Sequence, residues 1–216
     1  LAVTWMLRGD VAIGSGWLAR AKRLQEGLPR GSVTGLIRYL DCLGLLAAAR
    51  FDDAVVGARD IQQLGADLGD ATLTALGLAT EGVAQVRLGA VDTGLALLDE
   101  AMLPVVAGAV KPEYAGGVYC DMIAVCHDLV DPERARQWTE TTERWCAQFS
   151  SAAMYLGICR VHRVQLLGLA GAWVDAEREA MQVCREVVGV NAAVATEAHC
   201  QLARIRRLRG ELDAAA

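Results

Sequence analysis

Sulfur and imidazole side chains recur at similar distances before a repeated turn segment in the second half of the chain. These residues precede the turns that begin at positions 130, 171 and 210 by nine to twelve residues; they are Cys120, Cys159, His162, His199 and Cys200. Thiolate and imidazole are the usual ligands of zinc, so this pattern raises a metal or redox site. Cysteine is also a common small core residue, and no Cys-x₂-Cys pair occurs. Packing is the simpler interpretation, and we expect no metal and no cofactor.

A second group of polar side chains lies on two predicted helices near the C-terminal end. Its members share helical spacing with neighbouring apolar stripes, and they are Arg160, Arg163, Gln201, Arg204 and Arg207. Arginine binds carboxylates through two parallel hydrogen bonds, so these residues are candidates for binding a peptide or a small acidic ligand in a groove. The alternative is that they solvate the helix face or pair with local acids such as Glu197.

Sequence signatures of catalysis are absent. Gly14-Ser15-Gly16 lacks the Lys-Ser/Thr pair that completes a phosphate-binding loop. Neither a Gly-x-Ser-x-Gly segment nor a His-Glu-x-x-His segment occurs. We therefore predict no catalytic residues and no enzymatic activity.

The elements that would position these residues are organised by a repeat. A turn residue is followed by a polar residue, an apolar residue, an acid and, five positions on, a small residue. The segments begin at positions 9 (less regular), 49, 89, 130, 171 and 210, so the steps are 40, 40, 41, 41 and 39 residues. A fixed step of this size is the signature of stacked repeats.

The residue types at each turn agree with helix pairs. The acid lies near a helix N-terminus, where it can cap free N–H groups and meet the positive end of the helix dipole. The apolar third residue is expected to wedge between two helices, and the small sixth residue to allow close approach. Trp138, Trp145 and Trp173 are predicted to be mostly buried.

Between the turns, apolar residues recur at helical spacing and alternation typical of strands is absent. The helix near 113–130 has two apolar stripes, whereas the helix after residue 131 has only one. We predict an all-α fold: an α-solenoid of antiparallel helix pairs, tetratricopeptide-like with a step of about 40 residues, containing ten or eleven helices.

The ends of the array are incomplete in this pattern. The chain begins with Leu1 rather than Met, and the repeats start and stop within a helix pair. We expect residues 1–216 to be one helical-repeat domain cut from a longer chain. Exposed apolar residues at the ends favour association, so we expect a homodimer through Leu1, Val3 and Met6 or through Ile205 and Leu208.

Several segments resemble a known family. They are YCDMIAVC at 119–126, DPERARQWT at 131–139, RWC at 144–146 and CRVHR at 159–163 ahead of GAW at 171–173, with weaker matches at 16–21 and 94–102. They are similar to the tetratricopeptide-like segment of large bacterial LuxR-type transcriptional regulators. The resemblance implies a sensor or oligomerisation scaffold that controls a DNA-binding module following the repeats. A freestanding helical-repeat adaptor for a protein, peptide or acidic small ligand is the alternative.

Composition narrows the remaining classes. The chain has 21 basic and 26 acidic residues, a net charge of −5, so nucleic-acid binding by this segment itself is not expected. No apolar run reaches the length of a membrane span. Seven cysteines without a secretory signal favour the reducing cytoplasm.

Overall fold

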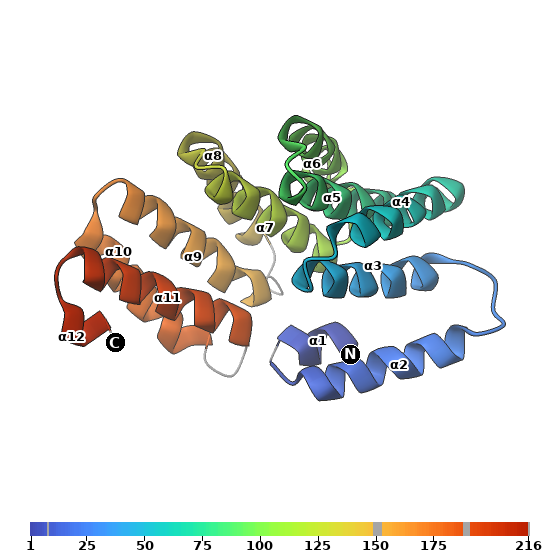
Figure 1. Ribbon diagram of the computed structural model, residues 1–216, viewed down its shortest axis with the longest axis horizontal. Helices are drawn as coiled ribbons and strands as arrows, with labels where there is room; N and C mark the ends of the chain where they lie inside the picture. The colour runs from blue at the N-terminus through green and yellow to red at the C-terminus, as the bar shows by residue number, and fades with distance from the viewer. Residues whose placement is uncertain (8, 149–152, 188–190, 216) are drawn as a thin grey trace. The chain divides into compact units, whose positions relative to one another are not determined.

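The computed structural model describes residues 1–7, 9–148, 153–187 and 191–215, and every regular element in this part of the chain is an α-helix (Figure 1). In chain order the helices are α1 (Ala2–Leu7), α2 (Val11–Gln25), α3 (Ser32–Ala47), α4 (Phe51–Leu68), α5 (Ala71–Arg87), α6 (Val91–Val106), α7 (Pro112–Asp128), α8 (Pro132–Cys146), α9 (Ala153–Leu169), α10 (Trp173–Val187), α11 (Ala192–Leu208) and α12 (Leu212–Ala215). The all-α prediction is confirmed. The described helices number twelve rather than ten or eleven, because α1 and α12 are short separate pieces.

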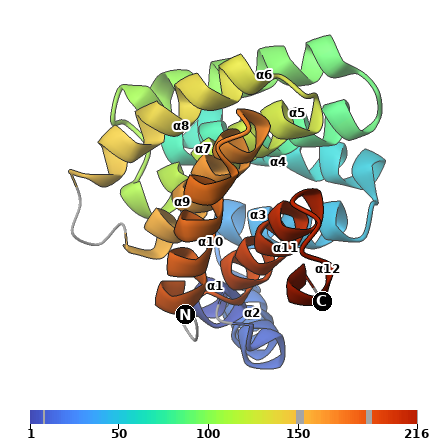
Figure 2. The same cartoon turned by 90° about the vertical axis from the view of Figure 1, so that its left-hand side faces the viewer.

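The chain divides into two compact units. The central unit comprises Gly16–Val125, and the terminal unit comprises Leu1–Ser15 together with Cys126–Ala216. In the central unit α3, α4, α5 and α6 pack consecutively (Figure 1). In the terminal unit α8, α9, α10, α11 and α12 do the same, and Figure 2 shows α9, α10 and α11 side by side. Packing between consecutive helices is what the repeat predicts.

Helix α5 forms the core of the central unit. Most of its residues from Thr72 to Ala84 are buried, because α4 packs on one side of it and α6 on another. Glycines bring these helices close together: a Cβ added at Gly94 would lie 2.6 Å from the carbonyl oxygen of Gly82. The predicted close approach at the small sixth residue is therefore observed at the α5–α6 contact.

Each predicted turn contains one residue with a left-handed backbone. The six are Gly9, Ala49, Gly89, Val130, Gly171 and Gly210, with φ between 55° and 91°. In every case this residue donates its N–H to the carbonyl three positions back, and the next residue donates to the carbonyl five positions back the first of the two, six back from itself counted inclusively, as in Asp131 N to Cys126 O. This pair of bonds is the Schellman motif, which satisfies the last carbonyls of a helix. The turns thus recur at the predicted steps.

The acids after these turns lie in the first turn of the next helix, as predicted, but most of them do not cap it. Asp52 follows Arg50, and Asp92 follows Ala90; neither of these N-cap residues makes a side-chain cap bond. Side-chain caps come instead from Asp70 to α5, Asp131 to α8 and Asn191 to α11. The acids at the other turns face the positive end of the helix dipole instead.

Several burial predictions need correction. Trp173 is 38% exposed and Leu212 is 64% exposed, so the apolar third residue does not wedge between helices at these two turns. Trp138 and Trp145 are half-buried. Ile205 is buried against Val164, Ala176 and Ala180, so it offers no apolar surface for the predicted dimer. The reason is that α10 lies against the α9 and α11 faces that the single-helix pattern left uncovered.

No helix in the described ranges is both long enough and apolar enough to cross a membrane.

Substituting Gly94 with Ala should lower the free energy of unfolding by about 1–3 kcal/mol, because the new methyl group overpacks the backbone of α5. Urea denaturation followed by far-UV circular dichroism measures this loss. Gly44→Ala is the control: no atom lies within 4 Å of its added Cβ. It should raise the free energy of unfolding by about 0.5–1 kcal/mol through the better helix propensity of Ala. A comparable loss in both variants would contradict the close-packing explanation.

Substituting Val130 with Gly should raise the free energy of unfolding by about 0.5–1 kcal/mol. Val130 is β-branched, holds φ at 57° and is 74% exposed, so the substitution removes backbone strain and little buried surface. The reverse change at the equivalent turn, Gly171→Val, should lower it by about 1–2 kcal/mol. Thermal and urea denaturation of both variants test the assignment of these turns; a destabilised Val130→Gly chain would refute it.

Candidate functional site

The five polar residues predicted to share a groove are not gathered in one place. Arg160 is held by Glu179 at 2.5 Å and by Glu186, so it links α9 to α10. Arg163 is exposed, with Nη1 3.9 Å from Glu143. Both side chains therefore make local ion pairs, as in the alternative interpretation.

The three predicted residues of α11 differ from one another. The Gln201 amide donates to Glu197 Oε1 at 2.7 Å. Arg207 is exposed on the surface. Only Arg204 lines the pocket described next, so one predicted residue of the five belongs to it.

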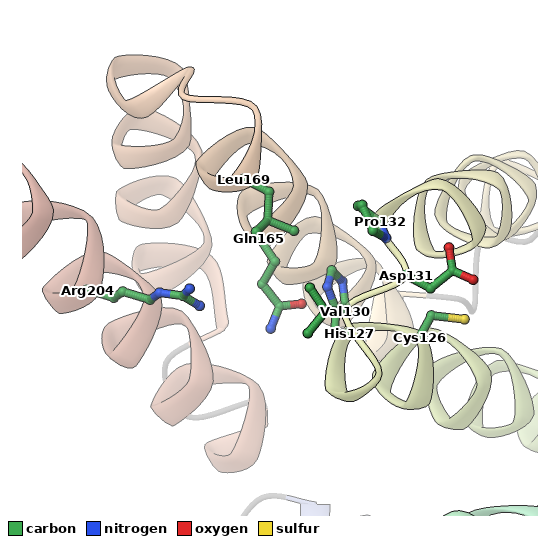
Figure 3. A pocket seen from close by; sticks show the side chains of 8 residues that line it. All are labelled: Cys126, His127, Val130, Asp131, Pro132, Gln165, Leu169 and Arg204. Atoms are coloured by element: carbon green, nitrogen blue, oxygen red, sulfur yellow. The ribbon is translucent and has the colours of Figure 1, made fainter. Parts of the chain in front are cut away.

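A pocket of about 140 Å³ lies in the terminal unit, between the C-terminal end of α7, the turn that follows it, α9 and α11. Its lining residues, shown in Figure 3, are Cys126, His127, Val130, Asp131, Pro132, Gln165, Leu169 and Arg204. One wall is the Schellman turn at Val130, which receives its two hydrogen bonds on the carbonyls of Cys126 and His127. The repeat turn thus forms part of the pocket.

Two histidines stack beside this turn. The rings of His127 on α7 and His162 on α9 have centroids 5.6 Å apart and planes inclined by 19°. Nε2 of each ring is buried and has no hydrogen-bond partner among the described residues. Buried polar atoms usually have a partner, so these nitrogens mark a place where the structure retains unused hydrogen-bonding capacity.

A chain of hydrogen bonds fixes the tautomer of His162. The Glu197 carboxylate accepts from the Gln165 amide at 3.3 Å, which turns the Gln165 carbonyl oxygen toward His162 Nδ1 at 3.0 Å. Because that oxygen can only accept, Nδ1 carries the proton. Nε2 of the neutral His162 ring is therefore a buried lone pair.

Burial keeps both rings neutral. It lowers the pKa of His162 to about 4, against the Gln165 hydrogen bond, which raises it, and with the His127 charge, which lowers it further. Burial also lowers the pKa of His127; the carboxylates of Asp128 and Glu197 oppose this shift and Arg204 adds to it. The pair is thus uncharged at neutral pH.

The predicted sulfur and imidazole constellation is not assembled among the residues that the structure describes. Cys120 belongs to the central unit, and the side chain of Cys159 lies outside the described part of the chain. His199 and Cys200 are exposed. Within the described ranges, no three His, Cys, Asp or Glu side chains form a group suited to a metal ion.

Sequence analysis missed His127 and Gln165. The repeat step of 41 residues places His162 level with Asp121 on α7, six residues before His127. Six residues correspond to about 9 Å of helix, so the stack depends on how α7 and α9 are placed rather than on the repeat register. A histidine in the last turn before a Schellman residue was the signal available.

Lowering the pH should destabilise the chain through His162. Its pKa is lower in the folded state than the ordinary 6.5, so the folded chain binds fewer protons, and the stability it contributes is lost as the pH falls from 6.5 toward about 4. Between pH 7 and pH 4.5, wild type should lose on the order of 2–3 kcal/mol more than His162→Phe. Urea denaturation at both pH values measures the difference. The exposed control His199→Gln should keep the wild-type pH dependence; equal slopes in all three proteins would rule out His162 as the titrating group.

Comparison of the chain with protein-family models, with curated proteins and with solved structures yields no match. The case for a function therefore stands on the repeat and on the pocket.

Proposed function

We propose that this chain is a non-enzymatic sensor and protein-interaction scaffold, the regulatory repeat segment of a LuxR-type transcriptional regulator. In this proposal the consecutive helices form a tetratricopeptide-like α-solenoid that works in the cytoplasm. A signal bound by the repeats changes their contact with a protein partner or with a DNA-binding module of the same polypeptide.

The observation that carries the proposal is the set of six Schellman turns at steps of 39 to 41 residues. Identical turns at a constant step place successive helix pairs in similar relations, which is how stacked repeats build extended binding surfaces. The segments that resemble the LuxR-type repeats include the turns at 130 and 171, so the resemblance coincides with the best-defined part of the repeat.

The pocket supports a sensing role. It combines an arginine, an amide and a buried imidazole with apolar side chains, a composition typical of small-ligand sites. It also contacts three helices, so a ligand there would bear on the relative placement of α7, α9 and α11.

The complete reading frame and a reporter assay test this function. We expect the natural polypeptide to continue beyond residue 216 into a basic helix-turn-helix, and deletion of residues 1–216 to abolish signal-dependent transcription while operator binding persists. A frame without a DNA-binding module would favour the freestanding adaptor. Unchanged regulation after the deletion would refute a regulatory role for the segment.

A further inference from the structure

The polar groups around the pocket are not consumed by the fold. Arg204 makes no ion pair among the described residues, whereas Arg206, two positions on, is 2.9 Å from Glu177. Figure 3 shows Arg204 extending from α11 and Gln165 from α9 toward the space beside His127. Gln165 uses one amide hydrogen on Glu197 and keeps the other.

The charge balance around this space selects a singly charged anion. Arg204 is the one cation among the lining residues. Glu197 and Asp128 act on His127 from nearby, and Asp131 lines the pocket with its carboxylate on the Arg134 N–H. One guanidinium matches one carboxylate, whereas a doubly charged phosphate would face these acids without a second cation.

The remaining wall is apolar and the space is small. Val130, Pro132 and Leu169 present hydrocarbon surface to the pocket. A volume of about 140 Å³ equals the share of roughly five water molecules in the liquid. An acid that fits therefore carries only a short aliphatic tail.

We infer that this pocket binds a short-chain aliphatic monocarboxylic acid, with its carboxylate on the guanidinium of Arg204 and the amide of Gln165 and its tail against Val130 and Leu169. The inference rests on the proposed sensing function, because it names the class of signal that the segment receives. The Glu197 hydrogen bond holds Gln165 in the orientation that directs its amide hydrogens away from His162.

The position of His127 gives the inference an independent readout. A bound carboxylate acts in the same direction as Asp128 and Glu197, which favour the protonated ring, and against Arg204 and the stacked His162. Binding should therefore be accompanied by proton uptake and should strengthen as the pH falls from 7.5 to 6, while the acid itself stays ionised.

The experiment is isothermal titration calorimetry of the whole chain with sodium butyrate, in two buffers that differ in ionisation enthalpy. Arg204→Gln should weaken butyrate binding about tenfold or more, since a charge-assisted hydrogen bond is lost. The matched control Arg207→Gln, an exposed arginine of the same helix that does not line the pocket, should stay within about twofold. His127→Gln should remove the proton uptake.

Neutral and larger probes decide between the remaining explanations. Butyramide, which has the shape of butyrate without its charge, should bind at least about tenfold more weakly. Val130→Gly, which should not impair folding, should weaken butyrate more than acetate because the tail loses its wall. Tighter binding of N-acetyl-alanyl-valine than of butyrate would overturn the assignment to a free acid in favour of a peptide C-terminus.

Equal binding of butyrate and butyramide, or equal loss in Arg204→Gln and Arg207→Gln, would overturn the inference. So would the absence of butyrate binding to a wild-type chain whose circular dichroism confirms folding. These outcomes leave the proposed function intact if the reporter still depends on residues 1–216. Loss of that dependence with butyrate binding preserved would refute the proposed function alone.

Discussion

One constraint recurs through this chain: a helix that ends must give its last carbonyls new hydrogen-bond donors, and here each long helix pair solves the problem with the same left-handed residue. The solution is local, since it needs only the N–H groups of the turn residue and its successor. Because it reverses the chain in a fixed way, the next helix starts in a similar direction each time. The regular step of the sequence is the covalent trace of that geometry.

The pocket exists because one of these turns also faces other helices. The carbonyls of Cys126 and His127 are engaged by the turn at Val130, which sets the last turn of α7 and the position of the His127 ring. On the other side, Glu197 of α11 orients Gln165 of α9, and Gln165 orients His162. Three helices thus fix each other's polar groups, which is the preorganisation that a binding site requires.

Most of the fold could be predicted, because glycine at a helix end and helical apolar spacing are local signals. Gly89, Gly171 and Gly210 announce their turns by residue type alone. The site could be predicted only through Arg204, because its other members depend on contacts between helices. Arg160 looked available from its own helix, yet its acids Glu179 and Glu186 lie on α10, 19 and 26 residues away. His127 and His162 meet six residues out of the repeat register, and no single-helix pattern encodes such an offset.

The unusual turn has a consequence for anyone who would redesign this protein from its own repeats. Averaging the six turns would write glycine at every left-handed position, since four of the six already have it. Such a consensus chain would gain backbone comfort at position 130 and lose the isopropyl group that shapes the pocket. Here the departure from the repeat, rather than the repeat itself, carries the information that distinguishes this array from a generic one.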